Sequence, residues 1–99
     1  MNSSFQAIIN GDQPVLIDFH AEWCGPCKTM KPILEDLKQQ MGDKVKIIKI
    51  DVDKNQRLAA ELKIQGVPTL ILYRNSQALW RQSGVVSSID LKNKINSLA

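Results

Sequence analysis

The sequence predicts an α/β fold in which helices flank a mixed four-stranded sheet. Over the first two thirds of the chain, apolar runs of strand length alternate with segments of helical periodicity, which is typical of parallel pairing. The segment 66–68, Gly-Val-Pro, breaks this alternation, and the remaining residues predict an antiparallel hairpin and a last helix. With 99 residues, of which 43% are hydrophobic, the chain fits one domain, residues 1–99, with a single core.

The first strand is expected to follow a short amphipathic helix. Phe5, Ile8 and Ile9 share one face of that helix, and the turn-forming residues 10–14 end it. The apolar run over 15–20 has the length and the flanking turn of a strand.

A long helix is predicted from the cysteines to about Gln40, because its apolar residues recur at helical spacing and Gly42 follows as a stop signal. Pro32 lies inside this helix and is expected to kink it. A second strand is predicted over 45–51. A further short helix follows it, and we expect Asp53 to cap that helix.

The last third of the chain predicts a β-hairpin and a helix. Strands over 69–73 and 78–82 flank a turn at 75–76, and Ser87 or Ser88 is expected to cap the final helix. The strand over 45–51 is expected at one edge of the sheet, with the first strand parallel to it and the hairpin beyond. Lysines 44, 46 and 49 would discourage pairing between molecules at that edge.

Composition argues against two classes of partner. The formal charge is only +3, and the 13 Lys and Arg residues are scattered among 10 acids, so a nucleic-acid partner is not expected. No apolar run approaches a membrane span, and the first residues lack the features of a signal peptide. We therefore expect no membrane partner and a cytoplasmic protein, although a mature periplasmic form that had lost its signal would look the same.

The two cysteines, Cys24 and Cys27, are the only ones in the chain and lie three residues apart where a strand gives way to a helix. The free N–H groups and the dipole of a helix N-terminus stabilise a thiolate, and this favours Cys24 as the ionised thiol. Disulfide exchange requires such a thiolate, and we expect Cys24 to be exposed and Cys27, one turn inside, to be shielded. The pattern indicates a redox-active dithiol.

Five landmarks in order resemble the thioredoxin family. They are the segment 18–28, Asp-Phe-His-Ala-Glu-Trp-Cys-Gly-Pro-Cys-Lys, then Pro32, the Lys-Ile-Asp-x-Asp segment 49–53, the Gly-Val-Pro-Thr segment 66–69, and Gly84. The resemblance covers almost the whole chain and implies a thioredoxin fold and a protein-disulfide reductase. Two features depart from the family pattern: no strand precedes the first helix, and His20 stands where many members have tryptophan.

The resemblance, together with the chemistry of exchange, implies roles at the dithiol. Cys24 would be the nucleophile and Cys27 the resolving thiol, with Gly25 and Pro26 shaping the tight turn between them. Asp18, a carboxylate inside an apolar strand, would have a raised pKa suited to proton transfer with Cys27, and Lys49 would be its partner. A structural Asp18 bonded to the backbone is the alternative. Alternation places His20 on the same face as Asp18, as a titrating neighbour or as a packing substitute for tryptophan.

Substrate contacts are also implied by the resemblance. The Val67–Pro68 bond would be cis and would leave the backbone of Val67 free to pair with an extended substrate, whereas an ordinary trans turn is the alternative. An apolar platform for the target is expected from Trp23, Val67, Pro68, Gly84 and Val85.

The expected partners are disulfide-containing proteins and a thioredoxin reductase or an equivalent electron donor, acting on a monomer without a bound cofactor. Two other interpretations stay open. A Cys-x-x-Cys pair is also half of a zinc site. His20 is the only further residue with a borderline-soft ligand atom, whereas a structural zinc site has four ligands, so we expect no metal. A non-catalytic subunit on the same fold is the other alternative.

Overall fold

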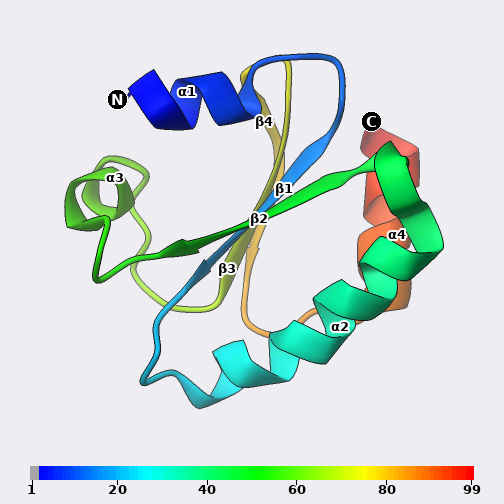
Figure 1. Ribbon diagram of the computed structural model, residues 1–99. Helices are drawn as coiled ribbons and strands as arrows, with labels where there is room; N and C mark the ends of the chain where they lie inside the picture. The colour runs from blue at the N-terminus through cyan, green and yellow to red at the C-terminus, as the bar shows by residue number, and fades with distance from the viewer. Residues whose placement is uncertain (1–2) are drawn as a thin grey trace.

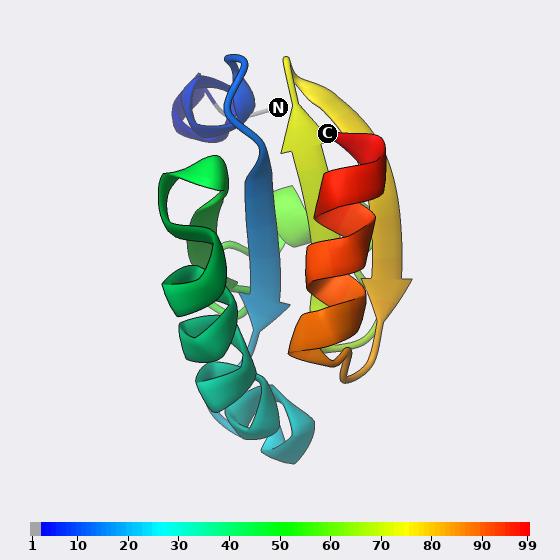
Figure 2. The same ribbon diagram turned by 90° about the vertical axis from the view of Figure 1, so that its right-hand side faces the viewer.

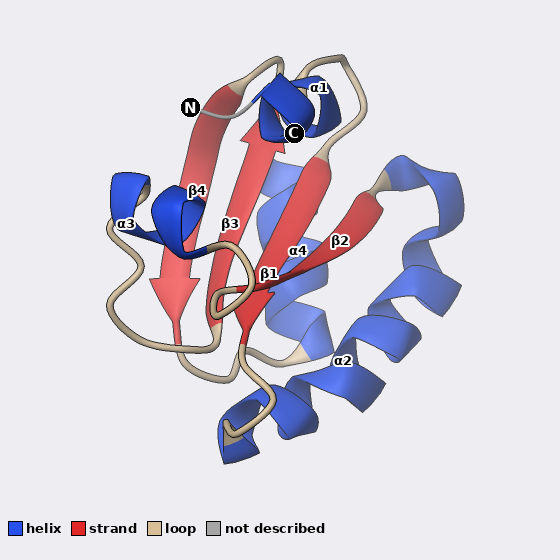
Figure 3. Ribbon diagram, turned by 60° about the vertical axis from the view of Figure 1, so that its left-hand side comes forward, coloured by secondary structure: helices blue, strands red, loops and turns tan. Residues whose placement is uncertain are grey.

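The computed structural model describes residues 3–99, and its strands form one mixed sheet in the order β2-β1-β3-β4. β1 pairs in parallel with β2, whereas β3 is antiparallel to both β1 and β4. Figure 3 shows this order across the sheet. The predicted four-stranded sheet and its strand order are therefore confirmed. The strands are β1 (Val15–His20), β2 (Lys46–Asp51), β3 (Thr69–Arg74) and β4 (Gln77–Ser83).

The helices cover the sheet on both faces. Figure 1 views the sheet close to edge-on, with α1 and α3 on one side and α2 and α4 on the other. Figure 2, turned by 90°, shows α2 and α4 side by side across one face. A short 3-10 helix over Gly42–Lys44 joins α2 to β2. The α-helices are α1 (Ser3–Ile9), α2 (Gly25–Met41), α3 (Gln56–Glu61) and α4 (Ser88–Leu98).

β1 lies at the centre of the hydrophobic core because both of its faces are covered. Leu16 packs into the cluster beneath α2 and α4, while Ile17 and Phe19 pack into the cluster with Phe5 of α1 on the other face. Successive side chains of a strand point to opposite faces, so Asp18 is directed toward the α2 face, as Leu16 is. The alternation thus places a carboxylate under the helix that bears the cysteines.

Local sequence signals account for most of the boundaries. Gly42 has φ of 55° and ends α2, and Asn75 and Ser76, with φ of 52° and 66°, form the turn of the β3–β4 hairpin. At the last helix, the Ser87 hydroxyl accepts a hydrogen bond from the N–H of Asp90 over 3.2 Å. Ser87, rather than Ser88, is therefore the cap. Pro32 lies inside α2, as expected.

The expected cap of α3 was wrong. α3 begins at Gln56, so Asn55 and not Asp53 occupies the N-cap position, and no side-chain cap bond is made there. The reason is that the carboxylate of Asp51 organises the preceding turn, where it accepts from the N–H groups of Asp53 at 2.8 Å and of Lys54 at 3.3 Å. Asp53 is thereby held before the helix starts.

Among residues 3–99, no helix is long and apolar enough to cross a membrane.

Candidate active site

The dithiol lies at the carboxyl end of β1, where the chain turns into α2. Cys24 is the N-cap of α2 and Cys27 lies in its first turn, and a disulfide joins them with a Cα–Cα distance of 5.3 Å. The N–H of Cys27 donates to Sγ of Cys24 over 3.1 Å. Pro26 occupies the second helical position, where a missing N–H costs nothing because no helical carbonyl could accept from it.

Exposure does not separate the two cysteines as the sequence suggested. Cys24 is 4% exposed and Cys27 8% exposed, so the expected exposed Cys24 is buried in this disulfide form. The cause is local packing, since both cysteines form a small cluster with Ala21, and Val52 and Val67 lie against it. What distinguishes the two is their position at the helix end: only the sulfur of Cys24 accepts a helix N–H.

The loop before β3 lies against Cys24. The Val67–Pro68 peptide bond is cis, as the resemblance implied, and the carbonyl oxygen of Val67 lies 3.5 Å from Sγ of Cys24. Two hydrogen bonds fix this loop: the N–H of Gly84 donates to the Pro68 carbonyl over 2.8 Å, and the hydroxyl of Thr69 donates to the Gly66 carbonyl over 2.6 Å. The structure therefore brings segments far apart in sequence to the same sulfur atom.

Most of the expected apolar platform is accessible. Trp23 is 72% exposed and Val85 46% exposed, and both Val67 and Gly84 are half-buried. Pro68, in contrast, is buried. It is therefore the one of the five expected platform residues that the structure places away from solvent.

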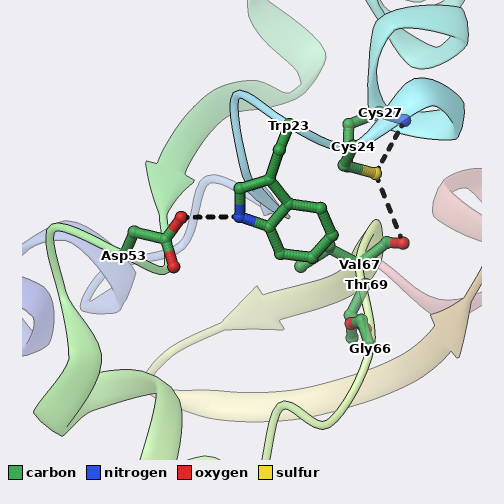
Figure 4. The surroundings of a disulfide bond; sticks show 7 residues. All are labelled: Trp23, Cys24, Cys27, Asp53, Gly66, Val67 and Thr69. Atoms are coloured by element: carbon green, nitrogen blue, oxygen red, sulfur yellow. Dashed lines mark hydrogen bonds between the residues drawn. A yellow bond between two sulfur atoms is a disulfide. The ribbon is translucent and has the colours of Figure 1, made fainter.

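Asp53 is a site residue that the sequence analysis missed. Its carboxylate accepts a hydrogen bond from the indole N–H of Trp23 over 2.8 Å (Figure 4). Trp23 and Val67 also line a small pocket of about 100 Å³ with Val52 and Ile64. The signal available in the sequence was the Asp-x-Asp spacing of 51 and 53, which predicts a turn that can present the second carboxylate.

Asp18 is buried behind the dithiol. It is only 2% exposed, and its Oδ1 has no hydrogen-bond partner among the residues that the structure describes. Burial raises the pKa of Asp18 above its ordinary value of 3.8, and the charges of His20 and then Lys49 oppose that rise. Asp18 and Cys27 line the same open pocket, of about 280 Å³. The backbone-bonded structural alternative therefore does not account for Oδ1.

Lys49 lies directly opposite Asp18 in the parallel β1–β2 ladder. It is exposed, and it lines the pocket that Asp18 and Cys27 share. His20 lines the same pocket from the end of β1 and pairs in register with Asp51. The predicted set of Asp18, Lys49 and Cys27 is thus gathered around one opening.

A zinc centre would need further ligands beside the two cysteines. Within residues 3–99, the structure places no group of three or more His, Cys, Asp or Glu side chains where they could hold a metal ion. The disulfide already uses both thiols, and a coordinating sulfur must be a thiolate.

Comparisons with known proteins agree with this geometry. The thioredoxin family model matches residues 1–97. Thioredoxin from Haemophilus influenzae is 43% identical over 89 residues, covering 90% of this chain and 83% of that protein, and thioredoxin from Rickettsia conorii is 37% identical over 97 residues, covering 97% and 92%.

Solved structures give the same result. A mutant thioredoxin from Halobacterium salinarum superposes with a TM-score of 0.88 at 35% identity, covering 99% of this chain and 85% of that one. Mitochondrial thioredoxin 3 from Saccharomyces cerevisiae, in its oxidised form, has a TM-score of 0.86 at 34% identity, covering 97% and 89%. With its disulfide-forming cysteine pair at the end of β1, the chain belongs to the thioredoxin family and is a protein-disulfide reductase.

Proposed function

We propose that Cys24 is the attacking thiolate of this reductase and Cys27 the resolving thiol. The observation that supports the assignment is the 3.1 Å hydrogen bond from the N–H of Cys27 to Sγ of Cys24 at the N-cap of α2. A thiolate at that sulfur receives a hydrogen bond and the favourable end of the helix dipole, and both lower its pKa. Cys27, inside the helix, lacks that environment and faces the Asp18 pocket.

The exchange takes place in two steps, attack on the target disulfide and resolution of the mixed disulfide. The Cys24 thiolate attacks one sulfur of the target disulfide, a Cys24–target bond forms, and the other target sulfur leaves as a thiolate. The S–H bond of Cys27 then breaks and its proton passes to the carboxylate of Asp18. The new thiolate attacks Sγ of Cys24, the disulfide of this chain forms, and the second target thiolate leaves. Two electrons pass from the dithiol to the target.

Asp18 acts as the base for Cys27, with Lys49 as its charged partner across the ladder. Two observations support this role: Oδ1 is buried without a partner among the described residues, and the pocket connects Asp18 to both Cys27 and solvent. A raised pKa moves the carboxyl toward the working pH, where a base and its conjugate acid both become available. Gly25 and Pro26 keep the two sulfurs within reach of each other, so resolution is intramolecular.

The target is held beside Cys24 by backbone and apolar contacts. The peptide groups of Val67 pair with an extended segment of the substrate, as in strand addition. Trp23, Gly84 and Val85 form the accessible surface around that segment, with Pro68 supporting the loop. Large apolar side chains at 72% and 46% exposure are expected where a partner covers them.

Thioredoxins generally act on disulfide substrates together with a thioredoxin reductase. We extend this pairing to the present chain: a thioredoxin reductase or an equivalent donor reduces the Cys24–Cys27 disulfide, and the chain works as a cytoplasmic monomer without a bound cofactor. The test is turnover of a disulfide-containing protein by NADPH and thioredoxin reductase. The protein should sustain the reaction, and Cys24→Ser should abolish it. A protein that instead purifies with stoichiometric zinc and gives no turnover would be a metal-binding module.

A further inference from the structure

His20 lines the same pocket as Asp18. It is the last residue of β1, is half-buried, and is two residues from Asp18, so strand alternation directs both side chains to the α2 face. Both residues line the open pocket of about 280 Å³ that also reaches Cys27. The imidazole therefore shares an open pocket with the buried carboxyl that we propose takes the proton of Cys27.

The other charged groups that line this pocket come from three parts of the chain. Glu22 follows β1, Lys28 and Lys31 come from α2, and Lys49 comes from β2. Asp51, also of β2, is the register partner of His20. Lysine and carboxylate side chains bear a constant charge near neutral pH when unperturbed, whereas an imidazole ordinarily gains its positive charge between about pH 8 and 5.

We propose that His20 is a positioning residue for the reductase reaction: as an imidazolium, it keeps Asp18 in the carboxylate form in mildly acidic solution. This rests on the proposed role of Asp18 as the base for Cys27. His20 itself exchanges no electrons and takes no proton from sulfur. The proton lost by Cys27 goes to Asp18 and from there to solvent through the pocket, so the balance of the two steps is unchanged.

The electrostatics of the site give the direction of this effect. Burial favours the neutral form of Asp18, and the positive charge of His20 is the larger of the two charges that oppose it, ahead of Lys49. A positive charge on His20 therefore stabilises the carboxylate form of Asp18 against the protonation that would remove the base. The pH range of resolution thereby extends downward.

Two variants separate charge from shape. His20→Gln removes the switching charge, and His20→Lys replaces it with a permanent positive charge. The direct readout is the pH titration of the Asp18 carboxyl carbon by NMR in the reduced protein. We expect Asp18 to titrate at a higher pH in His20→Gln than in the wild type, and at a pH no higher than the wild type in His20→Lys. Unchanged titration in a folded His20→Gln protein would overturn the proposal.

A kinetic readout connects the titration to the reaction. A mixed disulfide of Cys24 with a chromogenic aromatic thiol is prepared in acid, and the pH is then raised to values between 5 and 8 to start the attack by Cys27. At pH 6 the release of the aromatic thiol from His20→Gln should be at least about twofold slower than from the wild type, with rates converging at pH 8. Equal slowing at both pH values would indicate a merely structural role and overturn the proposal.

Repeating the measurement in Asp18→Asn distinguishes the two proposals. His20→Gln should cause no further slowing there, because the group through which His20 acts is gone. If Asp18→Asn itself resolves at the wild-type rate, the proposed base is wrong. In that outcome the NMR titration still decides whether His20 controls the ionisation of Asp18.

Discussion

The indole N–H of Trp23 donates to the carboxylate of Asp53 over 2.8 Å, although Trp23 is 72% exposed. Asp53 is itself held by its own N–H, which donates to the carboxylate of Asp51. A large aromatic side chain that would otherwise sample several rotamers is thus fixed beside Cys24. Contact with a substrate then costs less side-chain entropy.

Asp53→Ala tests this relationship. The freed indole must then be ordered when a substrate binds, at a cost of about 1 kcal/mol, which predicts a KM for protein disulfides raised roughly fivefold, with kcat little changed. Asp53→Asn keeps an oxygen acceptor and is the matched control. Steady-state kinetics with a protein substrate, together with the fluorescence anisotropy of the indole, provide the measurement, with Trp80→Phe as the background that leaves Trp23 as the only tryptophan. An unchanged KM in Asp53→Ala would show that the bond does not assist binding.

The order of attack can be determined from trapped intermediates. Cys27→Ser should accumulate covalent mixed disulfides with protein targets, because attack by Cys24 is intact and resolution is lost. Cys24→Ser should accumulate few. Non-reducing gels followed by mass spectrometry of the linked peptides provide the measurement, and equal trapping by the two variants would reverse or dissolve the assignment.

Asp18→Asn should raise stability at neutral pH while slowing resolution. Burial raises the folded-state pKa of Asp18 above its ordinary 3.8, so the folded state binds the proton more tightly than the unfolded state. The buried carboxylate therefore lowers the free energy of unfolding at pH values above the folded-state pKa of Asp18. This loss of stability decreases as pH falls through that pKa, and it disappears below the unfolded-state pKa. We expect the variant to be more stable by about 1 to 3 kcal/mol at pH 8, with the difference vanishing in acid.

Denaturant unfolding of the oxidised proteins across this pH range measures the difference. A stability gain that grows toward low pH would contradict the direction of the pKa shift. In the same variant, single-turnover kinetics should show slow resolution with normal initial attack; slow initial attack would rule out proton transfer to Asp18 as its role.

Lys46 and Lys49 of β2 should respond differently to substitution. They are three positions apart, so they lie on opposite faces of the strand, and only Lys49 lines the Asp18 pocket. Lys46→Val should promote association through the β2 edge with little loss of reductase rate, because a gatekeeper charge is replaced by a strand-forming residue. Lys49→Met should slow catalysis without association. Light scattering run beside the reductase assay tests both, and a Lys46→Val protein that stays monomeric at high concentration would contradict the first half.

The hairpin turn offers a stability test remote from the site. Ser76 has φ of 66°, a left-handed conformation that glycine adopts without penalty. Ser76→Gly should therefore stabilise the fold by about 0.5 to 1 kcal/mol, less the entropy that glycine adds to the unfolded chain. Asn75→Gly is the control, because Asn tolerates φ of 52° better than Ser does. Thermal unfolding should place Ser76→Gly above both Asn75→Gly and the wild type.

Sequence periodicity was sufficient for the sheet. The bounds of β1 agree with the predicted 15–20, and β2 begins one residue later than expected. These strands are buried on one or both faces, and burial imposes the apolar pattern that a sequence displays. The start of α3 was not predicted because Asp51 and Asp53 are both suitable as turn or cap residues. In the structure Asp51 holds the turn before α3, and Asp53 accepts from the indole of Trp23, which comes from a distant segment.

Residue types identified the site, but not its accessibility. Cys24 was recognisable as a thiol at the start of a predicted helix, and Asp18 as a carboxylate inside an apolar strand. The burial of Cys24 depends on Val52 and Val67, which come from other segments, and no local pattern reports such packing. His20 likewise could be placed on a face from alternation, but its place in the lining of the Asp18 pocket needed the three-dimensional structure.

The contact between Cys24 and the Val67 carbonyl joins residues that are 43 positions apart. During synthesis, both cysteines emerge long before the loop over 66–68 and before Gly84, whose N–H holds that loop. A partly synthesised chain therefore has both thiols without the backbone that would select an extended target. Selection of an extended target therefore requires the chain to be complete at least through β4, because Gly84 follows that strand and its N–H holds the loop.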